Sequence, residues 1–386
     1  MSGNFLITGM FRSGTTMLAR MMHSNPNVVC ASDPFAPIFK SYRNVVAKTI
    51  EDKFDENSPL NDYYFDKMQN NIFREIQKKD FNIAVPKDEL SALRGRIREH
   101  CKPYSPKIIP NLHMLKGSTY VELLDSAVEI IRKSYKKTGE NLIGYKEVWV
   151  DEMSMHFIKM KKGNKVIHLV RDPRSIVASN FSSGATYPLL FLIRQWRKLA
   201  SIAWMNEKNN KNIIFIKFED LILNPKEVAM RICEFLNIEY HVNMIDPNRY
   251  KDGNDDFWVQ NSSHDDNNLK GVRQKFNKQS LDKWKSVLSD EVISLIEIFC
   301  SYEMKLFGYH NSKKFDINQS GLLLDYKDNT SLYSEWIKLY APYDNSKEIA
   351  VELTRYLLLK SNVFLSKDTE KLFLLNSRIR PYFCKK

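Results

Sequence analysis

The sequence lacks the features that mark secreted, disulfide-linked and membrane-spanning proteins. Its 386 residues include five cysteines, with no CxxC pair, which argues against a zinc site and a disulfide framework. No apolar run approaches the roughly 18 residues that a membrane span requires. The N-terminus enters an apolar run at once, without the charged and apolar regions of a signal peptide. We therefore expect a cytoplasmic protein with reduced thiols and no membrane span.

Long runs of like charge are also absent, although the chain is basic. Lysine and arginine outnumber aspartate and glutamate by 58 to 46, which gives a formal net charge of +12 and favours anionic ligands. The positive residues are scattered, without an arginine-rich tail or a long basic run, so nucleic acid is not the expected partner. A polyanionic substrate or a nucleotide explains the charge as well.

Short apolar runs suited to buried parallel strands recur along the chain. They are residues 5–7, 141–145, 166–170 and the segment "NIIFIKFEDL" at 212–221. Helical patterns follow three of these runs, at about 15–23, from Arg174 and at 226–236. Strands alternating with helices predict an α/β fold with a P-loop-like parallel sheet covered by helices.

The rest of the chain predicts helical additions to this sheet. Residues from about 36 to 140 read as a largely helical insertion on the acceptor side of a domain spanning 1–310. Residues 311–386 are rich in Leu, Lys and Tyr and contain no recognised motif. We expect them to form a helical accessory region that closes a pocket or forms a homodimer.

The lysine of an NTP-binding loop is missing from "FLITGMFRSGTT" at residues 5–16. Gly9 and Gly14 have the spacing of a phosphate loop, but Thr15 stands where lysine is usual. The N–H groups of a glycine turn at a helix N-terminus still bind an anion, and Arg12 supplies charge. Without the lysine and a clear Walker-B acid, a triphosphate is poorly served. A single phosphate bearing a sulfuryl group needs less charge and no metal.

A second candidate phosphate site lies in "VIHLVRDPRSIVAS". Arg171 ends a predicted strand, and Ser179 follows eight residues later; the arginine fork and the hydroxyl could hold one phosphate together. The carboxyl ends of parallel strands meet at one edge of a sheet, so this site and the glycine turn should share a rim. Two phosphate sites there predict a nucleotide phosphorylated at its 5′ and 3′ positions.

These segments resemble those of the sulfotransferases that use 3′-phosphoadenosine 5′-phosphosulfate (PAPS). "FRSGTTMLARMM" is similar to their 5′-phosphosulfate loop and "VIHLVRDPRSIVAS" to their 3′-phosphate segment. "FEDLILNP" and "LDKWKSVLS" resemble further landmarks, in the expected order, over about residues 4–310. The likeness is closer to the bacterial and protein-tyrosine branch than to the cytosolic branch, whose C-terminal Arg-Lys-Gly signature is absent.

The resemblance implies which residues hold the donor and which do the chemistry. The donor-binding set would be Arg12, Ser13, Gly14, Thr15, Thr16, Arg171 and Ser179, with looser matches at Ser263 and Lys283. Lys146 in "GYKEVW" falls where the protein-tyrosine branch has a catalytic lysine, and Asp33 where it has a catalytic glutamate. Asp33 in "SDP" also fits a simple turn, and Glu147 and His23 are alternative bases.

The function implied is in-line transfer of the sulfuryl group of PAPS to a hydroxyl or amine of a small metabolite or glycan. A base takes the acceptor's proton, while Arg12 and Lys146 stabilise charge on the leaving phosphate, and no metal is required. The alternatives are a nucleotide kinase and a non-catalytic nucleotide-binding module. We expect His168, inside an apolar run, to be a hydrogen-bonded core residue.

Overall fold

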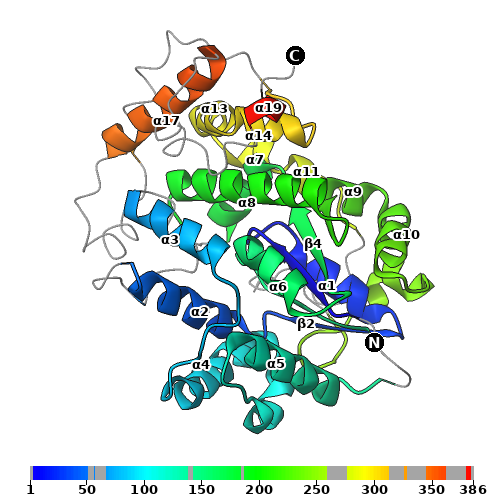
Figure 1. Ribbon diagram of the computed structural model, residues 1–386. Helices are drawn as coiled ribbons and strands as arrows, with labels where there is room; N and C mark the ends of the chain where they lie inside the picture. The colour runs from blue at the N-terminus through cyan, green and yellow to red at the C-terminus, as the bar shows by residue number, and fades with distance from the viewer. Residues whose placement is uncertain are drawn as a thin grey trace.

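A five-stranded, wholly parallel β-sheet forms the centre of the protein (Figure 1), with strand order β2-β3-β1-β4-β5. The computed structural model describes residues 3–50, 56, 67–137, 142–183, 187–258, 276–312, 326–327, 345–361 and 380–383. The strands are β1 (Phe5–Gly9), β2 (Val28–Ser32), β3 (Leu142–Lys146), β4 (Lys165–Val170) and β5 (Ile213–Lys217). The α/β class with a parallel sheet flanked by helices is confirmed.

Helices cover both faces of this sheet. In the N-terminal half they are α1 (Thr15–Ser24), α2 (Ala36–Lys48), α3 (Lys67–Lys78), α4 (Glu89–Tyr104), the 3₁₀ helix η1 (Pro106–Met114), α5 (Tyr120–Ser134), η2 (Asp151–Met153) and α6 (Ser154–Met160). Next come α7 (Pro173–Ser182), α8 (Leu189–Asn209), α9 (Phe218–Leu223), α10 (Pro225–Leu236), η3 (Val242–Ile245) and η4 (Pro247–Arg249). The last are α11 (Gln279–Asp282), α12 (Trp284–Val287), α13 (Asp290–Phe299), α14 (Ser301–Leu306), α17 (Asn345–Ser361) and α19 (Arg380–Phe383).

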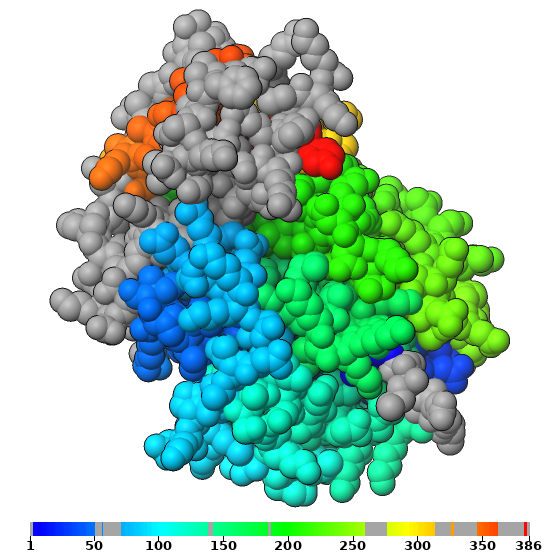
Figure 2. All heavy atoms as spheres, in the orientation of Figure 1, coloured from blue at the N-terminus to red at the C-terminus, as the bar shows by residue number. Residues whose placement is uncertain are grey.

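Two hydrophobic clusters pack on opposite faces of the sheet, because successive side chains of a strand point to opposite faces. Leu6 of β1 belongs to the larger cluster, with residues of α2, α5 and α8. Phe5 and Ile7 belong to the other, with Met21 and Met22 of α1 and residues of α10. In the all-atom view (Figure 2), atoms of α3, α5, α6 and α8 pack side by side on the face that is shown.

The structure differs from the predicted strands in two places. β2 was not among them: its five residues "VVCAS" are all buried, at the edge of the sheet beside β3. The predicted strand at 212–221 ends at Lys217, and "FEDLIL" forms α9. Phe218, Leu221 and Ile222 are the buried residues of α9, and their spacing of three and four is helical, not alternating.

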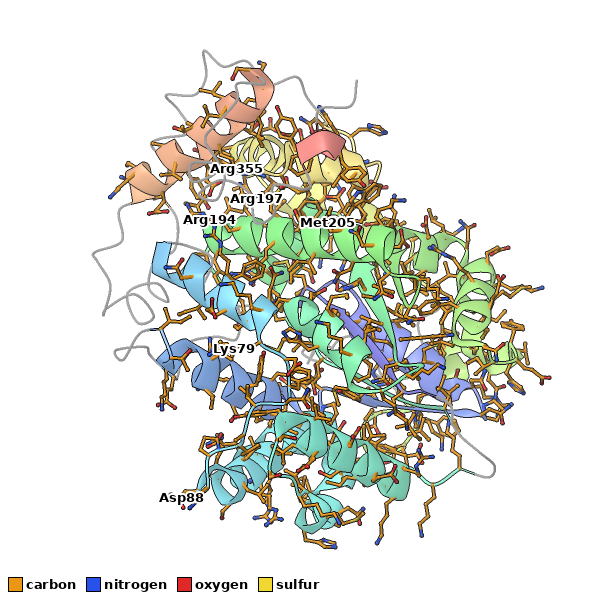
Figure 3. All side chains as sticks on the ribbon, in the orientation of Figure 1. Lys79, Asp88, Arg194, Arg197, Met205 and Arg355 are labelled. Atoms are coloured by element: carbon orange, nitrogen blue, oxygen red, sulfur yellow. The ribbon has the colours of Figure 1, made fainter. Side chains whose placement is uncertain are left out.

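The C-terminal helix α17 is joined to α8 through buried ion pairs. Arg194 of α8 contacts Glu348 at 2.6 Å, and both Arg194 and Arg197 contact Glu352. Arg355 of α17 reaches Glu303 of α14 at 2.6 Å. Figure 3 labels these three arginines where α8, α14 and α17 meet. In the described part of the C-terminal region, both these ion pairs and apolar residues such as Ile349 therefore attach α17 to the rest of the fold.

Candidate functional site

The turn between β1 and α1 is the first part of the site. Gly14 has φ 93°, and a side chain there would bring Cβ to 2.3 Å from the Phe218 ring, so only glycine fits. No side chain caps the N-terminus of α1, which leaves backbone N–H groups directed at the rim. Ser13 is fully buried and donates to the carbonyl of Met10 at 2.5 Å. The turn is shaped as an anion cradle.

Three of the residues predicted to bind PAPS meet beside this turn. Nε of Arg12 donates to Oγ of Ser179 at 2.9 Å, and Nη1 of Arg171 donates to the carbonyl of Arg12 at 2.9 Å. Arg12 has φ 65°, an uncommon conformation outside glycine. The structure thus brings together the loop, the end of β4 and α7, which the sequence assigned to one rim.

Arg171 is held by uncharged groups, not by a neighbouring acid. Nη2 donates to the carbonyl of Ser280 at 3.0 Å, and the guanidinium lies 4.3 Å from the centroid of the Phe218 ring. Asp172 pairs with Arg174 instead, at 2.6 Å. Burial lowers the pKa of Arg171 to about 10, so it stays charged at neutral pH. Its Nε is buried and has no hydrogen-bond partner within the described residues. A positive charge with a free donor is available at the rim.

Lys146 and Asp33 form the second part of the site. Lys146 ends β3 opposite Ser32, the last residue of β2. The N–H of Asp33 donates to the carbonyl of Lys146 at 2.7 Å, and Nζ of Lys146 forms an ion pair with Oδ2 of Asp33. Asp33 has φ 48°, a strained turn that directs its carboxylate back to the lysine. The structure joins these two predicted catalytic residues, which are far apart in the sequence.

The two alternative bases have structural roles. Glu147 is fully buried and accepts the N–H of Phe35 at the N-terminus of α2; burial and the charge of Asp33 raise its pKa well above the usual range. Nδ1 of His23 accepts the N–H of Cys30 at 3.1 Å, and Nε2 lies 3.3 Å from Asp255. Burial lowers the pKa of His23 to about 4. Both groups thus accept backbone hydrogen bonds inside the fold, and Oε2 of Glu147 has no hydrogen-bond partner among the described residues.

His100 is a candidate that the sequence did not reveal. The last turn of α4 packs on the Asp33 segment: Ser105 donates to the carbonyl of Ser32 at 2.7 Å, and the Cys101 thiol contacts that of Pro34 at 3.2 Å. His100 lies on this turn, and its Nε2 is buried without a hydrogen-bond partner in the described chain. Burial lowers its pKa, against the opposing charge of Asp33. No motif marks α4, so only packing places this imidazole near Asp33.

The remaining predicted residues contribute less to the described site. Lys283 is exposed between α11 and α12, near the Ser280 carbonyl that Arg171 contacts. Ser263 lies outside the described residues. His168 is fully buried, with Nδ1 at 2.7 Å from Asp151, so the prediction of a hydrogen-bonded core histidine is confirmed. Asp151 also accepts from Thr8 at 3.0 Å.

The described residues contain neither a grouped set of metal ligands nor a membrane-spanning helix. Among them, no three or more His, Cys, Asp or Glu side chains are grouped to hold a metal ion. No helix in the same part of the chain has the length and apolar character needed to cross a bilayer.

The structure is that of an α/β protein in which a glycine turn, Arg12 and Arg171 meet at the carboxyl edge of a parallel sheet. The family model that describes the sulfotransferase domain matches residues 2–308 of this chain. The chain therefore belongs to the sulfotransferase domain family, and the predicted family is confirmed. No curated protein sequence matches closely enough to count as a relative.

Solved structures with a similar course of the chain are bacterial sulfotransferases. The sulfotransferase domain of the curacin biosynthetic pathway has a TM-score of 0.41 at 14% identity, covering 80% of this chain and 99% of that one. The domain of the Synechococcus PCC 7002 olefin synthase has a TM-score of 0.44 at 14% identity, covering 80% and 97%. STF9 from Mycobacterium avium has 0.39 at 10% identity, covering 81% and 79%.

Proposed function

We propose that this sulfotransferase uses PAPS as donor and transfers its sulfuryl group to a hydroxyl or amine of a small metabolite or glycan. The observation that carries the proposal is the arrangement around one glycine turn. Arg12, Arg171 and Ser179 lie together on one side of it, and the Lys146–Asp33 pair lies across β1 on the other. Binding groups for two phosphates thus flank a cradle beside a pair that can stabilise charge and accept a proton.

The described residues fit the donor. The uncapped N-terminus of α1 and the absence of a Cβ at Gly14 leave backbone N–H groups for the 5′-phosphosulfate, with the hydroxyls of Thr15 and Thr16 beside them. Ser13 stays a proposed contact, and its hydroxyl would have to leave the carbonyl of Met10 to reach the donor. The unpartnered Nε of Arg171 and the hydroxyl of Ser179 suit the 3′-phosphate. Lys283, between two helices that pack on α7, and Ser263 remain proposed donor contacts. PAPS supplies an activated sulfuryl group on a phosphate that leaves readily.

In the proposed reaction, an acceptor oxygen or nitrogen attacks the sulfur in line with the bridging oxygen. The new bond to sulfur forms as the bond to the bridging oxygen breaks, and the electron pair leaves with 3′-phosphoadenosine 5′-phosphate. Lys146 and Arg12 stabilise the charge on that oxygen. When Lys146 turns to it, the Asp33 carboxylate is released to take the acceptor's proton. The unpartnered Nε2 of His100 makes this imidazole the second candidate for the proton.

The test compares nucleotides by thermal shift. We expect 3′-phosphoadenosine 5′-phosphate to raise the melting temperature and ATP with magnesium to have little effect, because the loop has no lysine after Gly14. Ser179→Ala should weaken the bisphosphate response, whereas Ser183→Ala, one turn further on, should not. Stabilisation by ATP alone would favour the nucleotide kinase instead. Bisphosphate binding without sulfate transfer to any acceptor would favour the non-catalytic module.

The class of acceptor, the domain division and the cellular location are further parts of this proposal. Labelled PAPS offered with a panel of sugars, amines and phenols tests the acceptor class directly. We also propose a sulfotransferase domain over 1–310 with an accessory region over 311–386, which could support a homodimer. The four described cysteines are all free thiols, which supports a cytoplasmic location.

A further inference from the structure

Arg20 is a buried cation whose charge no nearby acid neutralises through contact. It lies on the second turn of α1 and is 7% exposed. Its Nε is buried without a hydrogen-bond partner. Across the described residues, no hydrogen bond or ion pair reaches any of its three nitrogens. A guanidinium keeps its charge at any physiological pH, so Arg20 is a buried positive charge without a contacting anion.

Other buried arginines of the chain are neutralised by direct contacts with carboxylates. Arg174 contacts Asp172 and Glu297, both at 2.6 Å, and Arg355 contacts Glu303 at 2.6 Å. Burying a charge without a partner is costly, and such groups are concentrated at sites where a ligand supplies the missing partner. Burial lowers the pKa of Arg20, as expected for an uncompensated cation.

Arg20 lies on the other side of the sheet edge from Arg171, which is proposed to bind the 3′-phosphate of PAPS. The groups whose charges act on Arg20 are Tyr135, Asp252, Cys30 and Asp33. Cys30 and Asp33 belong to β2 and the turn after it, whereas Arg171 follows β4, and β3 and β1 lie between these strands. Tyr135 packs against His23 of α1, with ring centroids 5.5 Å apart, and Ser105, which follows α4, donates to the carbonyl of Ser32 just before Asp33. Arg20 therefore lies on the Asp33 side of the cradle.

We propose that Arg20 binds an anionic group of the sulfate acceptor, a carboxylate or a phosphate ester, beside the Lys146–Asp33 pair. The proposal rests on the proposed function in naming this ligand an acceptor. Arg20 is as little exposed as Arg171, at 7% and 8%. The acceptor class then narrows to hydroxyl or amine compounds that already carry a negative charge. The planar guanidinium binds carboxylate and phosphate through two parallel hydrogen bonds.

The experiment uses inorganic phosphate as the probe, titrated into the full-length protein with and without saturating 3′-phosphoadenosine 5′-phosphate. With the donor sites filled, we expect phosphate to raise the melting temperature of the wild type. Arg20→Met should lose this response, with phosphate binding at least about tenfold weaker, while its affinity for the bisphosphate stays unchanged. The matched control is Arg231→Met, which removes an exposed arginine of α10 paired with Glu207 at 3.4 Å.

Each other outcome has a definite meaning. An equal phosphate response in the wild type and Arg20→Met overturns the proposal, and so does no response in either. Weaker binding of the bisphosphate to Arg20→Met would assign Arg20 to the donor instead. A melting temperature of free Arg20→Met well below that of the wild type would indicate a structural role, since removing an unpaired charge should not destabilise the fold. Failure of the wild type to bind the bisphosphate would contradict the proposed function, while the titration without bisphosphate would still test Arg20.

Discussion

Single side chains of this protein have chemistry that depends on their neighbours. The Asp33 carboxylate is held by Lys146, and Glu147, the next residue, is fully buried at the N-terminus of α2. Lys146 and Glu147 are thus both buried but have different partners: the lysine pairs with a carboxylate, and the glutamate accepts a backbone N–H. The division of work between Asp33, Lys146 and His100 can be measured by single substitutions.

We expect Asp33→Asn and Lys146→Ala each to lower kcat by about 10²- to 10⁴-fold, because each removes a proton acceptor or a charge that stabilises the leaving group. The dissociation constant of 3′-phosphoadenosine 5′-phosphate should change little. Lys159→Ala, an exposed site on α6, is the control. His100→Gln should lower kcat by less than tenfold. A decrease in kcat equal to that of Asp33→Asn would identify His100 as the group that accepts the acceptor's proton.

His23 should make the folded state sensitive to acid. Its pKa is about 4 in the fold and 6.5 ordinarily, so between these values the unfolded chain binds more protons. The free energy of unfolding therefore increases as the pH rises from 4 to 6.5. It decreases by about 3 kcal/mol when the pH falls from 6.5 to 4. Urea unfolding at several pH values should show a shallower slope for His23→Gln. An unchanged slope would contradict this, and exposed His310→Gln is the control.

At the scale of elements, buried ion pairs join α8 and α17. Glu352 is 3% exposed and contacts both Arg194 and Arg197. These arginines lower its pKa to about 2 in spite of burial, which opposes them. The same α8 donates from Trp196 to the carbonyl of Arg171 at 2.8 Å. Helix α17 is therefore linked through α8 to Arg171 of the candidate PAPS site.

Removal of Glu352 should destabilise the protein strongly, since two buried guanidinium groups each lose their ion pair with it. We expect Glu352→Ala to cost about 3–5 kcal/mol, measured by chemical denaturation. Glu348→Ala, which removes a more exposed carboxylate from the same helix, should cost about 1 kcal/mol or less. Equal effects of the two substitutions would show that the buried pairs do not hold α17 in place.

For the whole molecule, burial protects the thiols. Cys30, Cys101, Cys233 and Cys300 are buried, and burial raises the pKa of Cys30 to about 12 and of Cys233 to about 11. Only the thiolate reacts readily. We expect the native protein to react quickly with a disulfide reagent at no more than one thiol, that of Cys384, and the denatured protein at all five. Two or more fast thiols in the native state would contradict the described packing.

The sequence by itself determined the α/β class, the family and the rim shared by Arg12, Arg171 and Ser179. These depend on local patterns: an apolar strand, a glycine turn and the start of a helix, each complete within a dozen residues. The edge strand β2 escaped prediction because its identity depends on pairing with β3, whose residues lie more than a hundred positions away.

Only the tertiary structure decided which side chains meet. The Lys146–Asp33 pair, the imidazole of His100 and the uncompensated Arg20 come from β3, the turn after β2, α4 and α1. No local pattern encodes the loss of a partner or of solvent, because burial arises only when distant segments pack together. The family can thus be recognised from the order of residues, whereas the charges available to an acceptor are set by the fold.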